Sequence, residues 1–322
     1  MPTYFVGSTF DAFTPSLIEA ADRGDRVEVY NGGYVDAYVT DPSTGQRTGV
    51  GRLWSHCVTD WVDQNQRNGD STFEWFNTEG VRVLRLFGVG GRAQQLSFWD
   101  GTEWRNAGEA QPTSGGTYDF LTVIHPTNGR LAWFVNGNLA ADVRGLDTSA
   151  MGQLARFRCK PIYFALSPSL ATAHRGVILA SYNTIGHIVR RRAPTGAGSS
   201  QDWSGTFTDI DEWGADDSDA ISASTVGDKS MFTAPAFPAP ATGNVIKTVA
   251  IAARIRNDGE VIPTNARAIV EVGGTEYLAP ADVPISPGFN GTHAVFDVNP
   301  ATGLPWASVE QASGQFGLVA TE

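Results

Sequence analysis

Short apolar and β-branched runs alternate with turn residues along most of the chain, and helical periodicity is almost absent. The runs recur about every 8–12 residues, a spacing typical of a β-sandwich or a β-barrel. One early segment, Ser16–Arg23, carries apolar residues that suit one helical face, and it predicts a short helix. Elsewhere the pattern predicts strands, and we therefore expect an all-β fold.

Four β-hairpins are predicted where asparagine, aspartate and glycine fall between two strand-like runs. These residues supply the positive φ angles that right-twisted hairpins require. The predicted hairpins join Val27–Tyr30 to Tyr34–Val39, Phe73–Phe76 to Val81–Phe87, Leu96–Trp99 to a strand through Trp104, and Leu131–Val135 to the residues after Asn136-Gly137.

A change of composition near residue 190 indicates a domain boundary. Arg190-Arg191-Arg192 precedes a run of small residues, 193–200, that cannot bury a core. The length of 322 residues also exceeds the usual size of one domain. We therefore expect one β domain over residues 1–198 and a smaller one over residues 199–322.

The net charge of −11 is distributed unevenly. Residues 1–200 hold 18 basic and 18 acidic residues, whereas residues 201–322 hold 5 and 16. Six of those 16 lie in Asp209–Asp219. An acidic chain is a poor partner for nucleic acid, so we expect none. The acidic run is predicted to pair with the basic cluster or with another subunit, which gives a candidate interface of Arg190, Arg191, Arg192, Asp209, Asp211 and Glu212. A solvated loop and a loose divalent-cation site are the alternatives.

Tryptophan supplies the candidate binding chemistry. In the Asp100-Gly101 hairpin, a two-residue loop would place Ser97 opposite Trp104, and a four-residue loop would place Trp99 opposite Trp104. Both registers put Trp99 and Trp104 on one face of the hairpin and Leu96 and Phe98 on the other. If Leu96 and Phe98 face the core, the two indoles form an exposed platform that suits the apolar face of a sugar ring. The alternative is that this face is internal or is covered by a loop or a subunit. The candidate carbohydrate site is Trp99, Asp100 and Trp104, and the tryptophans expected in the core are Trp54, Trp61, Trp75 and Trp133.

No catalytic constellation is found. Glycoside hydrolysis needs two carboxylates across a cleft, and Asp60 and Asp63 have the wrong parity to share one face of a strand. We therefore expect no catalytic residues and no enzymatic activity.

No metal or cofactor site is expected either. The loop that starts at Asp209 begins like a calcium loop but has Trp213 and Ala220 where oxygen ligands are required. The histidines show no metal-ligand spacing. Cys57 and Cys159 are expected to be buried free thiols, although they could meet between two sheets.

Two features bear on membranes. No apolar stretch approaches the roughly 20 residues that a bilayer-spanning helix needs, and the first ten residues lack the basic region of a signal peptide. We expect no membrane insertion and no signal peptide.

Several segments together resemble a known class of virion protein. Leu96–Trp104 and Leu131–Gly137 resemble the hairpins of concanavalin A-like (laminin-G-like) jelly-roll domains in tailed-phage or gene-transfer-agent particles. Trp203–Glu212 and Asn299–Trp306 are similar to second domains of the same class. The resemblance implies an N-terminal concanavalin A-like jelly-roll sandwich followed by a smaller C-terminal β-sandwich.

The same resemblance implies a function. It indicates a head spike, fibre or tail component that is made in the bacterial cytoplasm, resides in the virion and attaches to host cell-surface polysaccharide. Its expected partners are other virion subunits, in a homo-oligomer that is a trimer or a pentamer. The alternatives are a polysaccharide depolymerase that uses the jelly-roll groove and a purely architectural decoration protein.

Overall fold

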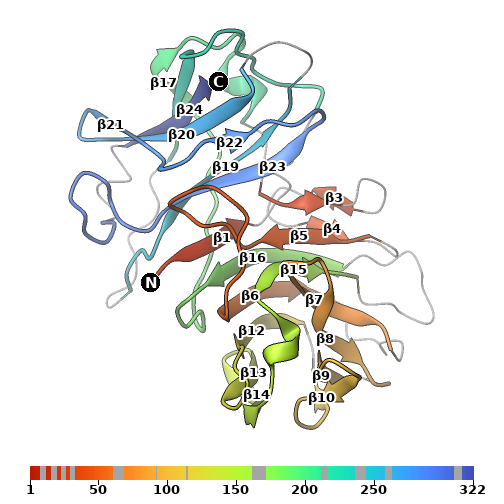
Figure 1. The fold of residues 1–322 in the computed structure, drawn as a ribbon. Coiled ribbons are helices and arrows are strands. Elements are labelled where there is room, and N and C mark those ends of the chain that lie inside the picture. The colour runs from red at the N-terminus through yellow and green to blue at the C-terminus, as the bar shows by residue number, and fades with distance from the viewer. Residues whose placement is uncertain are drawn as a thin grey trace. The chain divides into compact units, whose positions relative to one another are not determined.

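The chain divides into two compact units (Figure 1). Unit 1 comprises residues 1–9, 13–41 and 47–189, and unit 2 comprises residues 10–12, 42–46 and 190–322. The computed structural model describes the whole chain apart from residues 8–11, 16–19, 23–26, 30–32, 61–68, 92, 114, 162–171, 212–216, 236–243, 258–262 and 308–313.

Strands dominate the described residues. The helical elements among these residues are two short 3-10 turns, η1 (Ser149–Met151) and η2 (Phe207–Asp209). The all-β prediction is therefore confirmed. No helix in the described part of the chain is long and apolar enough to cross a lipid bilayer.

Unit 1 is a sandwich of two eight-stranded antiparallel sheets. Sheet A has the order β14 (Asn138–Leu146), β13 (Gly129–Val135), β12 (Gly116–Val123), β6 (Arg52–Asp60), β16 (Thr172–Ala180), β4 (Val27–Val29) and β3 (Ala20–Asp22), with β1 (Thr3–Gly7) also paired to β16. Sheet B has the order β10 (Trp104–Asn106), β9 (Ala93–Trp99), β8 (Arg82–Gly88), β7 (Ser71–Asn77), β15 (Leu154–Cys159), β5 (Val35–Tyr38) and β2 (Thr14–Pro15), with β11 (Gln111–Pro112) also paired to β9.

The core of unit 1 is built from aromatic side chains that alternate along the strands and face inward. Trp75 of β7 meets Phe120 of β12 with ring centroids 4.8 Å apart, and Phe73 meets Tyr118 at 5.4 Å. Such pairs bury large apolar areas between the sheets. Three of the tryptophans expected in the core, Trp54, Trp75 and Trp133, are buried, and the fourth, Trp61, lies outside the described residues.

Three of the four predicted hairpins are confirmed. They are β7–β8, β9–β10 and β13–β14. In the second of these, Trp99 lies opposite Trp104, which is the register of a four-residue loop.

The first predicted hairpin and the predicted helix are wrong. β4 pairs within sheet A and β5 within sheet B, because Val29 and Val35 are buried in different sheets of the sandwich. The described part of the predicted helix, Ala20–Asp22, is strand β3 paired to β4. A helical pattern of so few residues cannot offset the cost of nucleation, whereas a strand gains a complete ladder of partners.

Unit 2 consists of a six-stranded sheet and a separate strand pair. The sheet has the order β17 (Gly196–Gln201), β18 (Lys229–Thr233), β24 (Gln315–Thr321), β20 (Asn265–Val272) and β21 (Thr275–Leu278), with β22 (Val283–Pro284) also paired to β20. The pair is β19 (Val249–Ile255) and β23 (Asn290–Phe296).

A small apolar cluster packs these two parts of unit 2 together. It joins Ile251 of β19 and Phe296 of β23 to Val270 of β20 and to Trp306. The indole N–H of Trp306 donates to the carbonyl oxygen of Phe296 over 2.9 Å, so the ring is buried without an unpaired donor. The second unit is therefore a smaller sandwich with its own core.

Candidate functional site

The outer face of sheet B carries the two tryptophans of the β9–β10 hairpin. Leu96 and Phe98 point into the core and are 1% and 3% exposed. Trp99 and Trp104 lie directly opposite each other on the other face and are partly exposed. This arrangement follows from strand parity, and it confirms that the two indoles share the solvent side of the sheet.

The two indoles do not form a flat platform. Their ring centroids lie 6.1 Å apart and their planes meet at 62°, an edge-to-face pair. This geometry is the favoured one for neighbouring aromatic rings. The pair therefore offers an angled edge to a ligand.

A guanidinium group completes this part of the surface. The Cζ atom of Arg85, on β8, lies 4.5 Å from the ring centroid of Trp104 and 4.5 Å from that of Phe87. Burial lowers the pKa of Arg85 from its ordinary value; the charge of Arg82 lowers it further, and Glu74 acts in the opposite direction. Arginine nevertheless stays protonated at any physiological pH.

Two polar atoms at the same place lack hydrogen-bond partners among the described residues. One is Nε of Arg85 and the other is Oγ of Ser97, and both are buried. Arg85 and Ser97 are cross-strand neighbours on β8 and β9. Buried polar atoms usually have partners, so this nitrogen and this hydroxyl form an unsatisfied polar spot in the packing of the sheet face.

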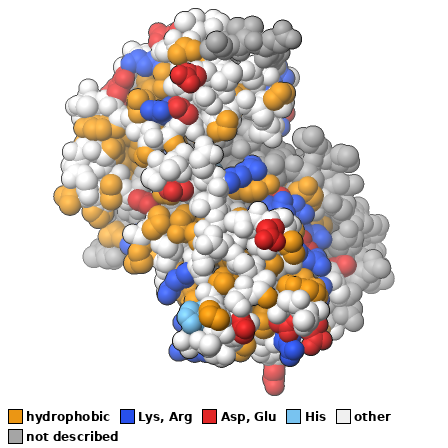
Figure 2. Space-filling model, viewed as in Figure 1, with side chains coloured by type: hydrophobic (Ala, Val, Ile, Leu, Met, Phe, Trp, Pro, Cys, Tyr) orange, Lys and Arg blue, Asp and Glu red, His pale blue; other side chains and the backbone are white. Residues whose placement is uncertain are grey.

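Two carboxylates on the neighbouring strands of this sheet are each paired with two basic side chains. Glu74 pairs with Arg82 at 2.6 Å and with Lys160 at 3.6 Å. Asp36 pairs in the same way with two arginines, Arg156 and Arg158, at 3.2 and 2.6 Å. Figure 2 shows Lys and Arg side chains beside hydrophobic ones in the region where Figure 1 labels β5, β15 and β7.

Asp100 has a structural part in the hairpin. Its carboxylate accepts hydrogen bonds from the backbone N–H groups of Thr102 and Glu103 and pairs with Arg105. The Arg105 contact and then the backbone bonds hold the pKa of Asp100 well below its usual range. Asp100 thus fixes the loop that sets Trp99 opposite Trp104.

We call Trp99, Trp104, Arg85, Phe87 and Ser97 the aromatic–arginine face. Sequence reasoning found the two tryptophans but missed the three residues that accompany them. Arg85, Phe87 and Ser97 alternate outward on β8 and β9, so strand parity could have placed them beside the indoles once the pairing of β8 with β9 was known.

Two residues of the acidic run 209–219 have local partners, and one of them, Asp209, belongs to the candidate interface. Asp209 accepts the backbone N–H of Thr206 at the start of η2 over 2.7 Å, and Asp217 forms a two-bond ion pair with Arg254. Asp211 is exposed, and Glu212 lies outside the described residues. The pairing of Arg190, Arg191 and Arg192 with this run stays a prediction.

A buried histidine–aspartate pair lies on the outer side of sheet A. The Nδ1 atom of His56 lies 2.8 Å from Oδ1 of Asp119, and the hydroxyl of Thr184 donates to the same oxygen over 2.8 Å. The hydroxyl therefore bonds the carboxylate and not the imidazole, so the three residues do not form a nucleophile–base–acid relay. They anchor the segment around Thr184 against the sheet.

Comparisons with known proteins give no family. No protein-family model matches the sequence, and no curated protein matches it. Solved structures with a similar fold include the CBM2 module of the evolved Dit protein of Lactobacillus casei BL23 phage J-1, at 12% identity over 52% of this chain and 74% of that one, with a TM-score of 0.33.

Two further solved structures also match part of this chain. The binding domain of botulinum neurotoxin serotype G is 5% identical over 56% of this chain and 48% of its own, with a TM-score of 0.37. A Trypanosoma rangeli sialidase is 12% identical over 53% of this chain and 28% of its own, with a TM-score of 0.35. This chain therefore spans less than half of either protein, and no functional residue is transferred from any of the three.

Proposed function

We propose that this protein is a non-enzymatic carbohydrate-binding component of a phage-like particle, and that the aromatic–arginine face binds acidic polysaccharide on the host cell surface. The observation that carries the binding proposal is Arg85, a half-buried guanidinium that packs against the rings of Phe87 and Trp104 beside the partly exposed hairpin tryptophans. The virion part of the proposal rests on the sequence resemblance to virion jelly-roll domains.

The chemistry of this face suits a sugar that carries a carboxylate, sulfate or phosphate. The C–H groups of a sugar ring can pack against the angled indoles of Trp99 and Trp104. The indole N–H groups can then donate hydrogen bonds to hydroxyl groups of the sugar. A guanidinium binds planar or tetrahedral oxyanions through paired hydrogen bonds. A site with both features prefers an acidic sugar over a neutral one.

The carboxylates on the same face argue for binding without hydrolysis. Glu74 and Asp36 are each held in ion pairs with basic side chains and are nearly fully buried. A general acid must reach the glycosidic oxygen, and neither of these buried, arginine-paired carboxylates is accessible to a substrate.

The binding proposal is tested with an array of neutral and acidic bacterial oligosaccharides, followed by titration calorimetry on each hit. Trp104→Ala and Trp99→Ala are expected to weaken binding by about 1 kcal/mol each, roughly fivefold, because each removes an aromatic contact. Arg85→Gln is expected to weaken binding of acidic glycans strongly and of neutral glycans little. Leu139→Ala, which alters an exposed apolar side chain on sheet A, is the control and should bind like the wild type.

Two outcomes would contradict the proposal. Unchanged affinity in all three variants would remove this face from glycan binding. New reducing ends after long incubation with a polysaccharide that binds would show a depolymerase, the alternative enzymatic function.

A further inference from the structure

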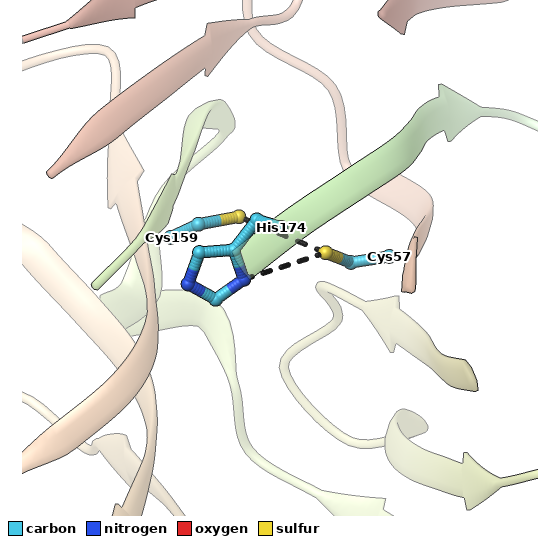
Figure 3. Close-up of side chains that lie close together, drawn as sticks. All are labelled: Cys57, Cys159 and His174. Carbon is cyan, nitrogen blue, oxygen red and sulfur yellow. Dashed lines mark hydrogen bonds between the residues drawn. The ribbon is translucent and has the colours of Figure 1, made fainter. Parts of the chain in front are cut away.

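Three potential metal ligands meet between the two sheets of unit 1. Cys57 belongs to β6 of sheet A, Cys159 to β15 of sheet B, and His174 to β16 beside β6. All three side chains are buried. Figure 3 shows the two sulfur atoms and the imidazole ring turned toward one another.

The distances fit one shared ion. The Sγ atoms of Cys57 and Cys159 lie 4.0 Å apart, and Sγ of Cys57 lies 3.8 Å from Nδ1 of His174. All three donor atoms lie within 4.8 Å of one another. Tetrahedral zinc, with bonds of about 2.3 Å to sulfur and 2.0 Å to nitrogen, sets two sulfurs roughly 3.8 Å apart and sulfur and nitrogen roughly 3.5 Å apart. The two observed separations are slightly longer than these values.

The histidine has the tautomer that a metal ligand needs. Its Nε2 atom lies 2.9 Å from the carbonyl oxygen of Lys160. A carbonyl oxygen can only accept, so Nε2 carries the hydrogen and Nδ1 presents a lone pair toward the sulfurs. A backbone carbonyl that orients the second ring nitrogen is the usual support of a metal-bound histidine.

A hydroxyl lies beside two of these donor atoms. Oγ1 of Thr59 is 3.3 Å from Nδ1 of His174 and 3.7 Å from Sγ of Cys57. Phe73 packs edge-on against the imidazole at 5.8 Å and helps to keep the cluster dry. A divalent ion on two thiolates is electrically neutral, which lowers the cost of burying it in this apolar setting.

We propose that Cys57, Cys159 and His174 bind a thiophilic divalent metal ion, with zinc as the best fit, which links sheet A to sheet B. Binding releases the two thiol protons to solvent and forms two metal–sulfur bonds and one metal–nitrogen bond; nothing is oxidised. Soft sulfur ligands select zinc over calcium or magnesium. The site is independent of the proposed glycan face.

The test uses untagged full-length protein produced with added zinc or cobalt. We expect one zinc ion per chain by elemental analysis, and thiolate-to-cobalt charge-transfer bands in the cobalt-loaded protein. Cys57→Ser, Cys159→Ser and His174→Gln should each abolish both signals. His125→Gln, at a histidine of the same unit outside the cluster, is the matched control and should retain them.

A second measurement covers the case in which a variant fails to fold. Wild-type protein refolded with zinc should melt several degrees higher than the same protein refolded with a chelator, because the ion binds only the folded cluster. The proposal would be overturned if the protein contained no metal, showed no cobalt charge-transfer bands, and melted at the same temperature after refolding with zinc and with a chelator. So would thiol titration of the denatured protein showing a Cys57–Cys159 disulfide in place of two thiols.

Discussion

A hydrogen bond crosses between the two sheets of unit 1 in the aromatic core. The indole N–H of Trp75, on sheet B, donates to Oγ of Ser55, on sheet A, over 2.9 Å. Both residues are buried. The pair shows that single polar atoms in this core are matched across the sandwich, which fixes the position of one sheet on the other.

Replacement of Ser55 by alanine is expected to lower the free energy of unfolding of unit 1 by about 1–3 kcal/mol, because it leaves the Trp75 N–H buried and unpaired. Urea unfolding followed by tryptophan fluorescence measures the change. In a Trp75→Phe background, which has no N–H to satisfy, Ser55→Ala should cost much less. Equal costs in the two backgrounds would mean that the hydrogen bond adds nothing.

At the scale of single elements, local turn chemistry explains the hairpins that were predicted correctly. Asn136 and Gly137 join β13 to β14 with φ angles of 51° and 77°. Two successive positive φ angles are what a type I′ turn requires, and Asn-Gly is its preferred sequence. The Val27–Val39 region has a similar local pattern, yet its strands separate into two sheets because burial of both strands outweighs the turn preference.

Gly137→Ala is expected to destabilise unit 1 by about 1 kcal/mol or more, because a Cβ atom is disfavoured at positive φ. Space is not the reason, since the nearest heavy atom to such a Cβ is 3.9 Å away. Gly51 is the control: it has no neighbour within 4 Å and no positive φ. Gly51→Ala should therefore be neutral or slightly stabilising in the same urea experiment. Equal losses at the two positions would contradict the backbone explanation.

At the scale of the whole molecule, the net negative charge is concentrated in unit 2. Residues 190–322 contain 8 basic and 16 acidic residues, so this unit repels itself at neutral pH. Specific pairs offset part of the repulsion. Arg267 binds both oxygens of Asp282 at 2.7 Å, and Lys229 pairs with Glu276 at 2.7 Å.

The Arg267–Asp282 pair predicts a pH dependence. Hydrogen bonding by Arg267, assisted by Thr321, lowers the pKa of Asp282 from its ordinary value. Its contribution to stability is therefore fully present above the unfolded-state pKa of about 3.9 and is lost as the pH falls through the lower folded-state value. In Asp282→Asn, unit 2 should lose less stability than the wild type between pH 5 and the onset of acid unfolding.

The control for this experiment is Asp219→Asn, which removes an exposed carboxylate of the same unit. Urea unfolding of each variant over the pH series measures the slopes. We expect the Asp219→Asn slope to stay close to that of the wild type. Identical slopes for the two variants would show that net charge, and not the ion pair, sets the pH response of unit 2.

The sequence by itself determined the features that depend on neighbouring residues. Strand-length apolar runs and turn residues act over a few positions, so the all-β class, three hairpins and the shared face of Trp99 and Trp104 could be predicted. Charge is additive, so the acidic second part was evident as well.

Only the tertiary structure decided which distant strands face each other. It brought Cys57 within 4.0 Å of Cys159 across 102 positions and placed His174 beside them. It set the guanidinium of Arg85 against Trp104, although both lie in predicted strands. Such contacts arise from the packing of whole sheets, which balances burial over many strands at once, and no local pattern in the sequence specifies that balance.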